Sequence, residues 1–151
     1  MKICFFSGDI TRSGGTERVA LNIANELASQ NRDYEIHILS LEHGHTQPFF
    51  KMNEKIKSSY IFEKKTKNPI LRFFKTVKGI REYLVKNNID FLIDIDTILS
   101  VFSIPAIIAT DVKHVAWEHF TINQNLGVRY RDWGRKLATK FSDAINSILR
   151  C

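Results

Sequence analysis

The stretch MKICFFSGDITRSGGTERVALNIANEL, residues 1–27, holds a short apolar run, a glycine-containing loop and an amphipathic pattern, in that order. Residues 3–6 are all apolar, which is typical of a strand buried on both faces of a sheet. A loop that contains Gly14-Gly15 follows this strand pattern. Apolar residues then recur over 16–27 with the period of an α-helix. This stretch therefore predicts a strand, a loop and a helix, which together begin a β-α-β unit.

The first turn of this helix also carries the expected end signals. We expect Thr16 to be the N-cap, because a threonine hydroxyl can accept a hydrogen bond from a free backbone amide. Glu17 follows it and complements the positive end of the helix dipole. The helix should bury one stripe, made by Val19, Ala20, Ile23, Ala24 and Leu27.

The rest of the chain continues to alternate between the two periods. Strands are expected at 34–41, 57–62, 89–95 and 114–117, helices at 69–86, 98–109 and 128–141, and the start of one more strand at 145–149. Such alternation predicts a mainly parallel sheet with helices on both faces, which is a Rossmann-like three-layer α/β/α domain. With 151 residues and no linker-like segment, we expect one domain over residues 1–151.

The composition excludes several classes of protein. The chain is 44% hydrophobic and 25% charged, with three prolines and seven glycines, so it is neither disordered nor collagen-like. It has no apolar run long enough to cross a bilayer, and its start lacks the longer apolar region of a signal peptide. Cys4 and Cys151 have no partner at ligand spacing, so we expect reduced cysteines in a cytoplasmic protein.

A basic segment accounts for much of the net charge of +6. Residues 64–86 hold eight lysines and arginines and a single acid, Glu82. The expected helix over 69–86 sets Lys75 and Lys78 beside neighbouring phenylalanines, which fits a helix that touches anionic lipid. The alternative is an ordinary helix that packs its apolar stripe on the core and leaves a solvated basic face. Nucleic-acid binding is not expected, because no recognition helix or aromatic RNA-binding motif is present.

Polar residues follow three of the expected strands. In an open parallel sheet, ligands bind beyond the carboxyl ends of the strands. We therefore expect these side chains to meet on one rim of the sheet and to contact a ligand there. The candidates are Asp9 and Arg12 after the first strand, Asp94 and Asp96 at the end of the strand at 89–95, and Glu118 and His119 after the strand at 114–117.

The loop Ser13-Gly14-Gly15-Thr16 is a candidate phosphate site. Two glycines let the backbone approach a ligand, and the helix that follows directs free N–H groups at it. The alternative is a tight turn without a ligand. Neither the dinucleotide fingerprint G-x-G-x-x-G nor the Walker A pattern is present, which argues against NAD enzymes and P-loop ATPases.

The acidic and histidine candidates also have alternative interpretations. His119 could act as a base or bind a sugar hydroxyl, or it could be a surface histidine in a loop. Asp94 and Asp96 alternate along one expected strand and should share a face. We expect Asp94 to cap the helix that starts near residue 98, and we keep Asp96 as a candidate ligand-binding residue. His43 and His45 lack a third ligand, so no metal site is expected.

The opening stretch of the chain resembles the amino-terminal domain of family 4 retaining glycosyltransferases, which have the GT-B fold. That family has a first strand, a Gly-Gly loop and a helix with the pattern G-G-x-E-R, matched here over residues 14–18. The resemblance continues through YEIHILSL, IDFLIDID, HVAWEHF and RDWGRKLATKFSDAI, so it covers nearly the whole chain.

The resemblance implies one half of a two-domain enzyme that transfers a hexose from a nucleotide sugar with retention of configuration. This half would bind a glycan or lipid-linked acceptor for cell-surface polysaccharide synthesis, without a metal or cofactor. Gly14, Gly15 and Thr16 would lie against the donor phosphates, and His119 close to the transferred sugar. The family's second domain, which holds most of the donor, is not among residues 1–151, so we expect little activity from this chain alone.

A second class of function stays open at this point. A non-catalytic Rossmann-like module that binds a phosphate-bearing ligand or a partner protein would show the same strand and helix order. We expect an enzyme that works in the cytoplasm, peripheral to the inner membrane face. The presence of a second Rossmann-like half in the gene would distinguish the two.

Overall fold

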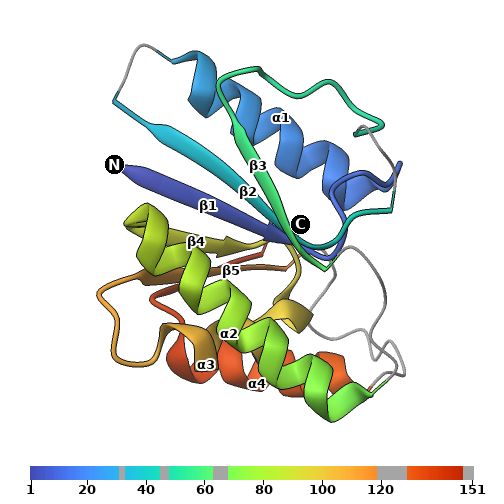
Figure 1. Cartoon of the computed structure of the whole chain (residues 1–151), viewed down its shortest axis with the longest axis vertical. Helices are drawn as coiled ribbons and strands as arrows, with labels where there is room; N and C mark the ends of the chain where they lie inside the picture. The colour runs from blue at the N-terminus through green and yellow to red at the C-terminus, as the bar shows by residue number, and fades with distance from the viewer. Residues whose placement is uncertain (31–32, 45–47, 63–67, 119–128, 148–151) are drawn as a thin grey trace.

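The computed structural model of the chain describes residues 1–30, 33–44, 48–62, 68–118 and 129–147 (Figure 1). In this part of the chain the strands are β1 (Lys2–Ser7), β2 (Glu35–Glu42), β3 (Lys57–Phe62), β4 (Phe91–Asp94), β5 (Lys113–Glu118) and β6 (Ala144–Ser147). The helices are α1 (Gly15–Ser29), α2 (Pro69–Asn87), the 3-10 helix η1 (Thr97–Leu99), α3 (Ser100–Ile107) and α4 (Arg129–Phe141). All the strand pairs are parallel, and the strand order is β3-β2-β1-β4-β5-β6. The predicted parallel α/β fold is confirmed.

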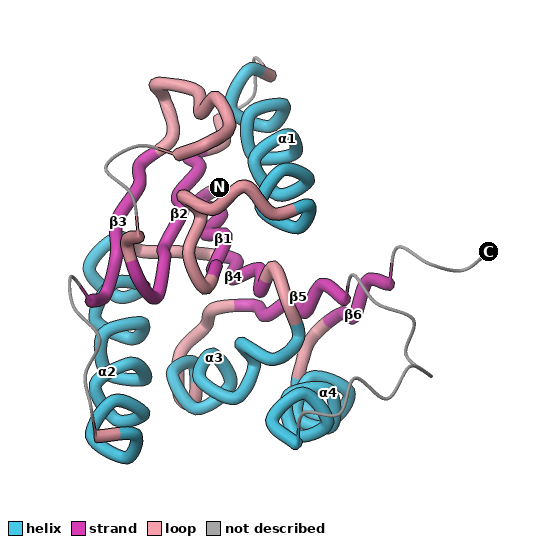
Figure 2. Tube along the Cα trace, turned by 90° about the vertical axis from the view of Figure 1, so that its right-hand side faces the viewer, coloured by secondary structure: helices cyan, strands magenta, loops and turns pink. Residues whose placement is uncertain are grey.

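The helices form two layers around the sheet. The helix α1 covers one face, and α2, α3 and α4 cover the other (Figure 2). Because side chains alternate along a strand, the apolar run of β1 serves both faces. Ile3 and Phe5 pack with α1 in one core, whereas Cys4 and Phe6 pack with α2 and α3 in the other. The prediction of a first strand buried on both faces is confirmed.

The start of α1 differs from the prediction. The N-cap is Gly14, whose extended backbone precedes the helix, and Thr16 lies inside the first turn. The Thr16 hydroxyl donates to the carboxylate of Glu17 (2.8 Å) instead of capping a backbone amide. The N-cap prediction for Thr16 was wrong because the helix begins two residues earlier than expected, with Gly14 as the cap and Gly15 as the first helical residue.

The buried stripe of α1 is also displaced from the predicted one. Val19 and Ile23 are exposed, and Ala28 is buried. The residues of α1 that face the sheet are Ala20, Leu21, Ala24 and Ala28, with Leu27 packed at the edge. The small alanines let the helix lie close to the strands, and the larger β-branched residues lie on the outer side.

The boundaries of α2 agree with the end signals in the sequence. The Asn68 side chain caps the helix by accepting from the amides of Ile70 and Leu71, and Pro69 is the first helical residue. Asn88 ends the helix in the left-handed conformation, with φ of 52°.

The first turns of α2 extend beyond the sheet. Ile80 and Leu84 are buried, but Ile70, which belongs to the same series of apolar residues at helical spacing, is 70% exposed. Nineteen helical residues span about 28 Å, whereas the six residues of β1 span roughly 20 Å. Because the last turn of α2 lies beside the amino end of β1, the first turns project past the strand ends (Figure 1).

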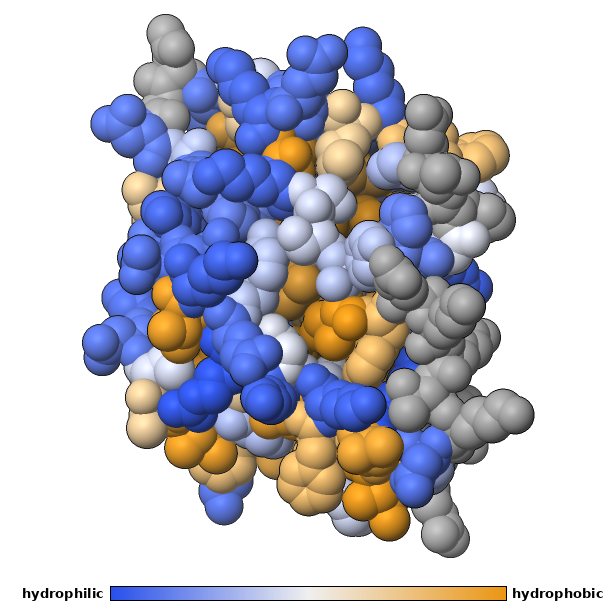
Figure 3. Space-filling model, in the orientation of Figure 1, coloured by the Kyte–Doolittle hydropathy of each residue, from blue (hydrophilic) through white to orange (hydrophobic). Residues whose placement is uncertain are grey.

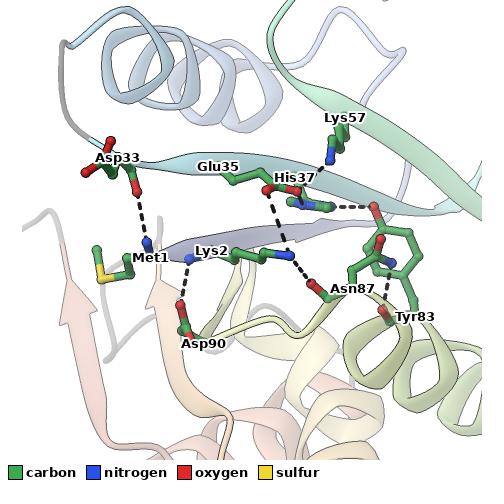
Figure 4. A network of polar contacts seen from close by, with 9 residues as sticks. All are labelled: Met1, Lys2, Asp33, Glu35, His37, Lys57, Tyr83, Asn87 and Asp90. Atoms are coloured by element: carbon green, nitrogen blue, oxygen red, sulfur yellow. Dashed lines mark hydrogen bonds and ion pairs between the residues drawn. The ribbon is translucent and has the colours of Figure 1, made fainter.

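A polar network ties the amino ends of the strands together (Figure 4). His37 is fully buried; its Nε2 donates to Glu35 (2.9 Å), and its Nδ1 accepts from the Tyr83 hydroxyl (2.9 Å). Lys57 also donates to Glu35 (2.6 Å), and the Lys2 ammonium lies 3.8 Å from the same carboxylate. This network joins β1, β2, β3 and α2 at the end of the sheet opposite the predicted site.

The network shifts the pKa values of its members. Hydrogen bonds from Lys57 and His37 lower the pKa of Glu35 to about 2. Burial lowers the pKa of His37, so its ring stays neutral, and burial raises the pKa of Tyr83 to about 12. For Glu35 and His37 the pKa is lower in the folded state than in the unfolded state. Both therefore stabilise the fold at neutral pH and lose that contribution as the pH falls.

We expect Glu35→Gln to reduce the free energy of unfolding by about 1 kcal/mol at pH 7, a small value because solvent screens this partly exposed carboxylate. The difference from the wild type should shrink as the pH falls from about 4.5 towards 2, where the folded wild type gains its proton. Urea denaturation at pH 7, 4 and 2.5 measures it. Glu26→Gln, at an exposed position on α1, is the control. A difference that is the same at all three pH values would contradict this explanation.

Candidate functional site

A pocket of about 230 Å³ lies at the carboxyl end of the sheet, between β1 and β4. From β1 the chain moves outward to β2 and β3, and it then returns to β4 on the other side of β1. This is the point where the strand order reverses, and open α/β sheets bind ligands at such points. The lining residues are Ser7, Gly8, Asp9, Arg12, Thr16, Glu17, Ile95, Asp96, Ile98 and Leu99.

The structure brings together four of the residues that the sequence singled out. Asp9 and Arg12 enter the pocket from the loop after β1, Thr16 from the first turn of α1, and Asp96 from the segment after β4. They come from two separate stretches of the chain, which meet because β1 and β4 are neighbours in the sheet.

The loop after β1 is held in place by Asp9. One carboxylate oxygen of Asp9 accepts from the backbone amide of Thr11 (3.0 Å) and from the Thr11 hydroxyl. The other oxygen lies against Gly44, where an added Cβ would collide with it. Thr11 is buried, and Arg12 beside it is exposed. The loop therefore presents the Arg12 guanidinium from a fixed backbone.

Glu17 contributes a further carboxylate that was not among the residues predicted to contact a ligand. It lines the pocket, and its carboxylate folds back over Gly14, where an added Cβ would collide with it. The signal that could have identified it is its place in the first helical turn, two residues after the glycine pair. No local feature of the sequence indicated that Ser7, Ile95 and Ile98 line the pocket.

Gly15 is not required by the fold of the described chain. A Cβ built at Gly15 meets nothing within 4 Å, and its backbone does not have the positive φ that favours glycine. Gly15 is the first residue of α1, where backbone N–H groups have no intrahelical partners, and the N-cap Gly14 has no side chain to satisfy them. The open space at this helix end leaves room for a ligand to approach the backbone.

The capping role that was predicted for Asp94 belongs to Asp96, which also lines the pocket as a candidate ligand-binding residue. Asp96 is the N-cap of η1 and accepts from the amide of Ile98 (3.1 Å). Asp94 is fully buried and accepts from Ser100 (2.8 Å), Ser103 (2.6 Å) and His114 (2.8 Å). The strand ends at Asp94, so the alternation that would have placed both acids on one face stops there.

The remaining predicted residues are placed only in part. Glu118 is the last residue of β5, at the same edge of the sheet, and its side chain is not described. His119 lies outside the described residues. Lys75 and Lys78 are exposed on α2, with the Lys78 ammonium 3.7 Å from Glu82.

The charges of the pocket favour a ligand rich in hydroxyl groups. Asp9, Glu17 and Asp96 supply carboxylate oxygens, Arg12 supplies donors, and Ser7 and Thr16 supply hydroxyls. Within the described ranges no three His, Cys, Asp or Glu side chains lie close enough to hold a metal ion. Such a mixture can form paired hydrogen bonds with a sugar, while the open helix end at Gly15 suits a negatively charged group.

Comparisons with known proteins agree with this geometry. The chain has the fold of one Rossmann-like half of a GT-B glycosyltransferase, and the sequence model of glycosyltransferase family 4 matches residues 13–148. The chain belongs to this family.

Three similar proteins show how far the similarity reaches. An uncharacterized glycosyltransferase of Haemophilus influenzae is 35% identical over 144 residues, which are 95% of this chain and 39% of that protein. The lipopolysaccharide outer core galactosyltransferase WaaB matches with a TM-score of 0.64 and 23% identity over 88% of this chain and 37% of its own. Sucrose-phosphate synthase from Thermosynechococcus elongatus matches with a TM-score of 0.73 and 10% identity over 96% and 41%. The chain therefore spans about two fifths of the length of these proteins.

Proposed function

We propose that the chain is the acceptor-binding half of a retaining glycosyltransferase that moves a hexose from a nucleotide sugar to a glycan or lipid-linked acceptor in cell-surface polysaccharide synthesis. The observation that carries this proposal is the open backbone at Gly15 beside a polar pocket at the switch point of the sheet. No packing contact in the described chain requires glycine at position 15. Close approach of a diphosphate to the backbone would require it.

In this proposal the pocket residues have different binding roles. Asp9, Arg12, Asp96 and Glu118 would bind acceptor hydroxyls, and this binding would orient the attacking oxygen. Gly14, Gly15 and Thr16 would face the donor phosphates. A second domain would hold the rest of the donor and close the site against water.

The test of this function is sugar transfer by the product of the complete gene. The full reading frame is expressed and offered a panel of nucleotide sugars, and release of the nucleoside diphosphate is measured with and without a glycan acceptor. We expect turnover with a narrow set of donors. No release with any donor would contradict the enzyme proposal and would favour a non-catalytic binding module.

We expect His119→Ala to lower turnover at least about 100-fold in the same protein, because a group beside the reacting sugar contributes about that factor in general acid–base or hydrogen-bonding roles. The melting temperature should stay within about 2 °C of the wild type. His43→Ala, at an exposed position after β2, is the matched control. A lower melting temperature with unchanged turnover per folded molecule would make His119 a structural residue.

We also propose that the basic face of α2 rests on an anionic membrane at the inner, cytoplasmic face. No helix in the described part of the chain is long and apolar enough to span a bilayer. Lys75 and Lys78 are exposed beside Phe74, which is 64% exposed, so this face combines cations with apolar side chains.

Neutralising both lysines as Lys75→Gln and Lys78→Gln should weaken binding to vesicles containing anionic lipid by roughly 30-fold at low salt, at about 1 kcal/mol for each charge. Co-sedimentation with vesicles at 20 and 300 mM salt measures this. The control exchanges Lys136 and Lys140, which are exposed on α4. Equal losses of vesicle binding in the two double variants would show that binding depends only on net charge. They would contradict a specific membrane-binding face on α2.

A further inference from the structure

A second cavity, of about 560 Å³, lies between the start of α2 and the segment after β4. It is lined by Pro69, Ile70, Arg72, Phe73, Ile98, Val101 and Phe102, and we call it the α2–α3 groove. Six of its seven lining residues are apolar. The charged one, Arg72, forms an ion pair with Glu42 and places its guanidinium 5.9 Å from the centre of the Phe62 ring. The groove therefore presents an apolar interior whose single charge is already paired.

The mouth of the groove is apolar as well. The first turns of α2 project past the strand ends, and they leave Ile70 70% exposed, with Leu71 and Phe74 also exposed. Figure 3 shows apolar side chains gathered over this part of the molecule, next to hydrophilic ones. Lys75 and Lys78 follow on the same helix. An apolar groove at the start of a helix that also carries exposed cations suits a molecule with a hydrocarbon chain and a polar or anionic head.

The groove adjoins the polar pocket. Ile98 lines both cavities, because η1 lies between them. The Asp96 side chain caps this short helix on the pocket side. A ligand that lies along η1 can thus place one end against Phe73 and Phe102 and the other end among Asp9, Arg12 and Asp96.

We propose that the α2–α3 groove binds the hydrocarbon chain of a lipid-linked acceptor whose sugar head occupies the polar pocket. This rests on the proposed function, because it takes the pocket as the acceptor site, and it narrows the acceptor from any glycan to a glycan on a lipid. A protein segment would need partners for its backbone N–H and C=O groups along the groove. The lining residues are apolar apart from the paired Arg72. A hydrocarbon chain, which has no N–H or C=O groups, therefore fits the groove better than a peptide does.

The test measures how affinity depends on chain length. The 151-residue chain is titrated by calorimetry with hexyl, octyl and decyl glucoside, each below its critical micelle concentration, and with glucose. If the added methylenes enter the groove, the affinity should rise about fourfold for each methylene. Equal affinity for the three alkyl glucosides would overturn the proposal.

Two variants of α2 test where the hydrocarbon chain of the ligand binds. Ile70→Glu places a charge at the mouth of the groove and should abolish the dependence on chain length. Val85→Glu makes the same exchange at a residue that is 59% exposed near the other end of α2, and it should keep that dependence. Both positions are exposed, so neither variant should unfold the protein, which circular dichroism checks. The same loss in both variants would overturn the assignment to the groove.

A third variant tests the link to the pocket. Asp96→Asn should weaken binding of all three alkyl glucosides by a similar factor and leave the dependence on chain length unchanged. If Asp96→Asn changes no affinity, the head does not reach the pocket and the proposal is wrong. If Ile70→Glu impairs binding to anionic vesicles and not the binding of single alkyl glucosides, the first turns of α2 dock on a bilayer, and the groove proposal is likewise overturned.

These outcomes are distinct from failure of the proposed function. A flat dependence on chain length, with sugar transfer by the full gene product to a soluble glycan, would overturn the groove alone. A steep dependence with no release of nucleoside diphosphate from any donor would overturn the enzyme instead and leave a lipid-binding domain.

Discussion

Replacing Gly15 with valine should reduce nucleotide-sugar turnover by the full gene product at least about 100-fold and leave its melting temperature unchanged. The branched side chain would stand at the amino end of α1, where a Cβ meets nothing within 4 Å in the described protein. Bound phosphates would have to retreat from the backbone amides there. Losing two charge-assisted hydrogen bonds at about 1.5 kcal/mol each gives roughly that factor.

The measurement is the rate of nucleoside diphosphate release at saturating acceptor, together with a thermal melt. Ser29→Val is the control, because it introduces the same side chain at an exposed position near the other end of α1. Gly15→Ala should have an intermediate effect, since a single methyl group blocks less of the approach. Wild-type turnover in Gly15→Val would disprove the donor-phosphate role of the glycine loop.

Replacing His114 with leucine should lower the free energy of unfolding by about 3–5 kcal/mol, a large part of the stability of a domain of this size. His114 and Asp94 are both fully buried, and the ring nitrogens contact Asp94 (2.8 Å) and Ser142 (2.7 Å). Without the imidazole, the Asp94 carboxylate keeps only two serine donors in a site that water does not reach.

Urea denaturation at pH 7 measures the loss, with His43→Leu as the control at an exposed position. The double variant Asp94→Ala, His114→Leu should be less destabilised than the sum of the two single variants, because no unpaired charge is left behind. Additive losses would show that the two side chains do not interact. A loss below about 1 kcal/mol in His114→Leu would mean that the pair contributes little to stability.

The contact between His114 and Asp94 also affects the polar pocket. Asp94 ends β4, and the next residues, Ile95 and Asp96, form one wall of the pocket. The hydrogen bonds from Ser100 and Ser103 join that strand end to α3. Movement of Asp94 would therefore move the wall that carries Asp96, and we expect His114→Leu to weaken alkyl glucoside binding as well.

The elements that could be predicted from the sequence are those with a local cause. The apolar run at 3–6 alternates between two cores, as a central parallel strand must. The start of α2 was predictable from Pro69, and its end from the asparagines at 87 and 88, because these residues act on the backbone beside them. The order of strands and helices, together with the right-handed crossover rule, was enough to predict a parallel α/β sheet.

Burial within each helix could not be predicted in the same way. Val19, Ile23 and Ile70 fit the apolar period and are nevertheless exposed. Period alone does not say how far the sheet extends beneath a helix or how close the helix lies. The short alanines of α1 and the overhang of α2 determine those, and both depend on neighbours that are distant in the sequence.

The sequence alone determined the α/β class, the position of the polar residues at the carboxyl end of the sheet and, through G-G-x-E-R, the glycosyltransferase family. Only the tertiary structure decided that Asp96 faces the pocket while Asp94 is buried on His114. It alone showed that Glu17 lines the pocket, and that Ile98 joins the pocket to an apolar groove. Local periodicity follows from backbone geometry, whereas the surroundings of a side chain depend on the pairing of β1 with β4, two strands that are far apart in the sequence.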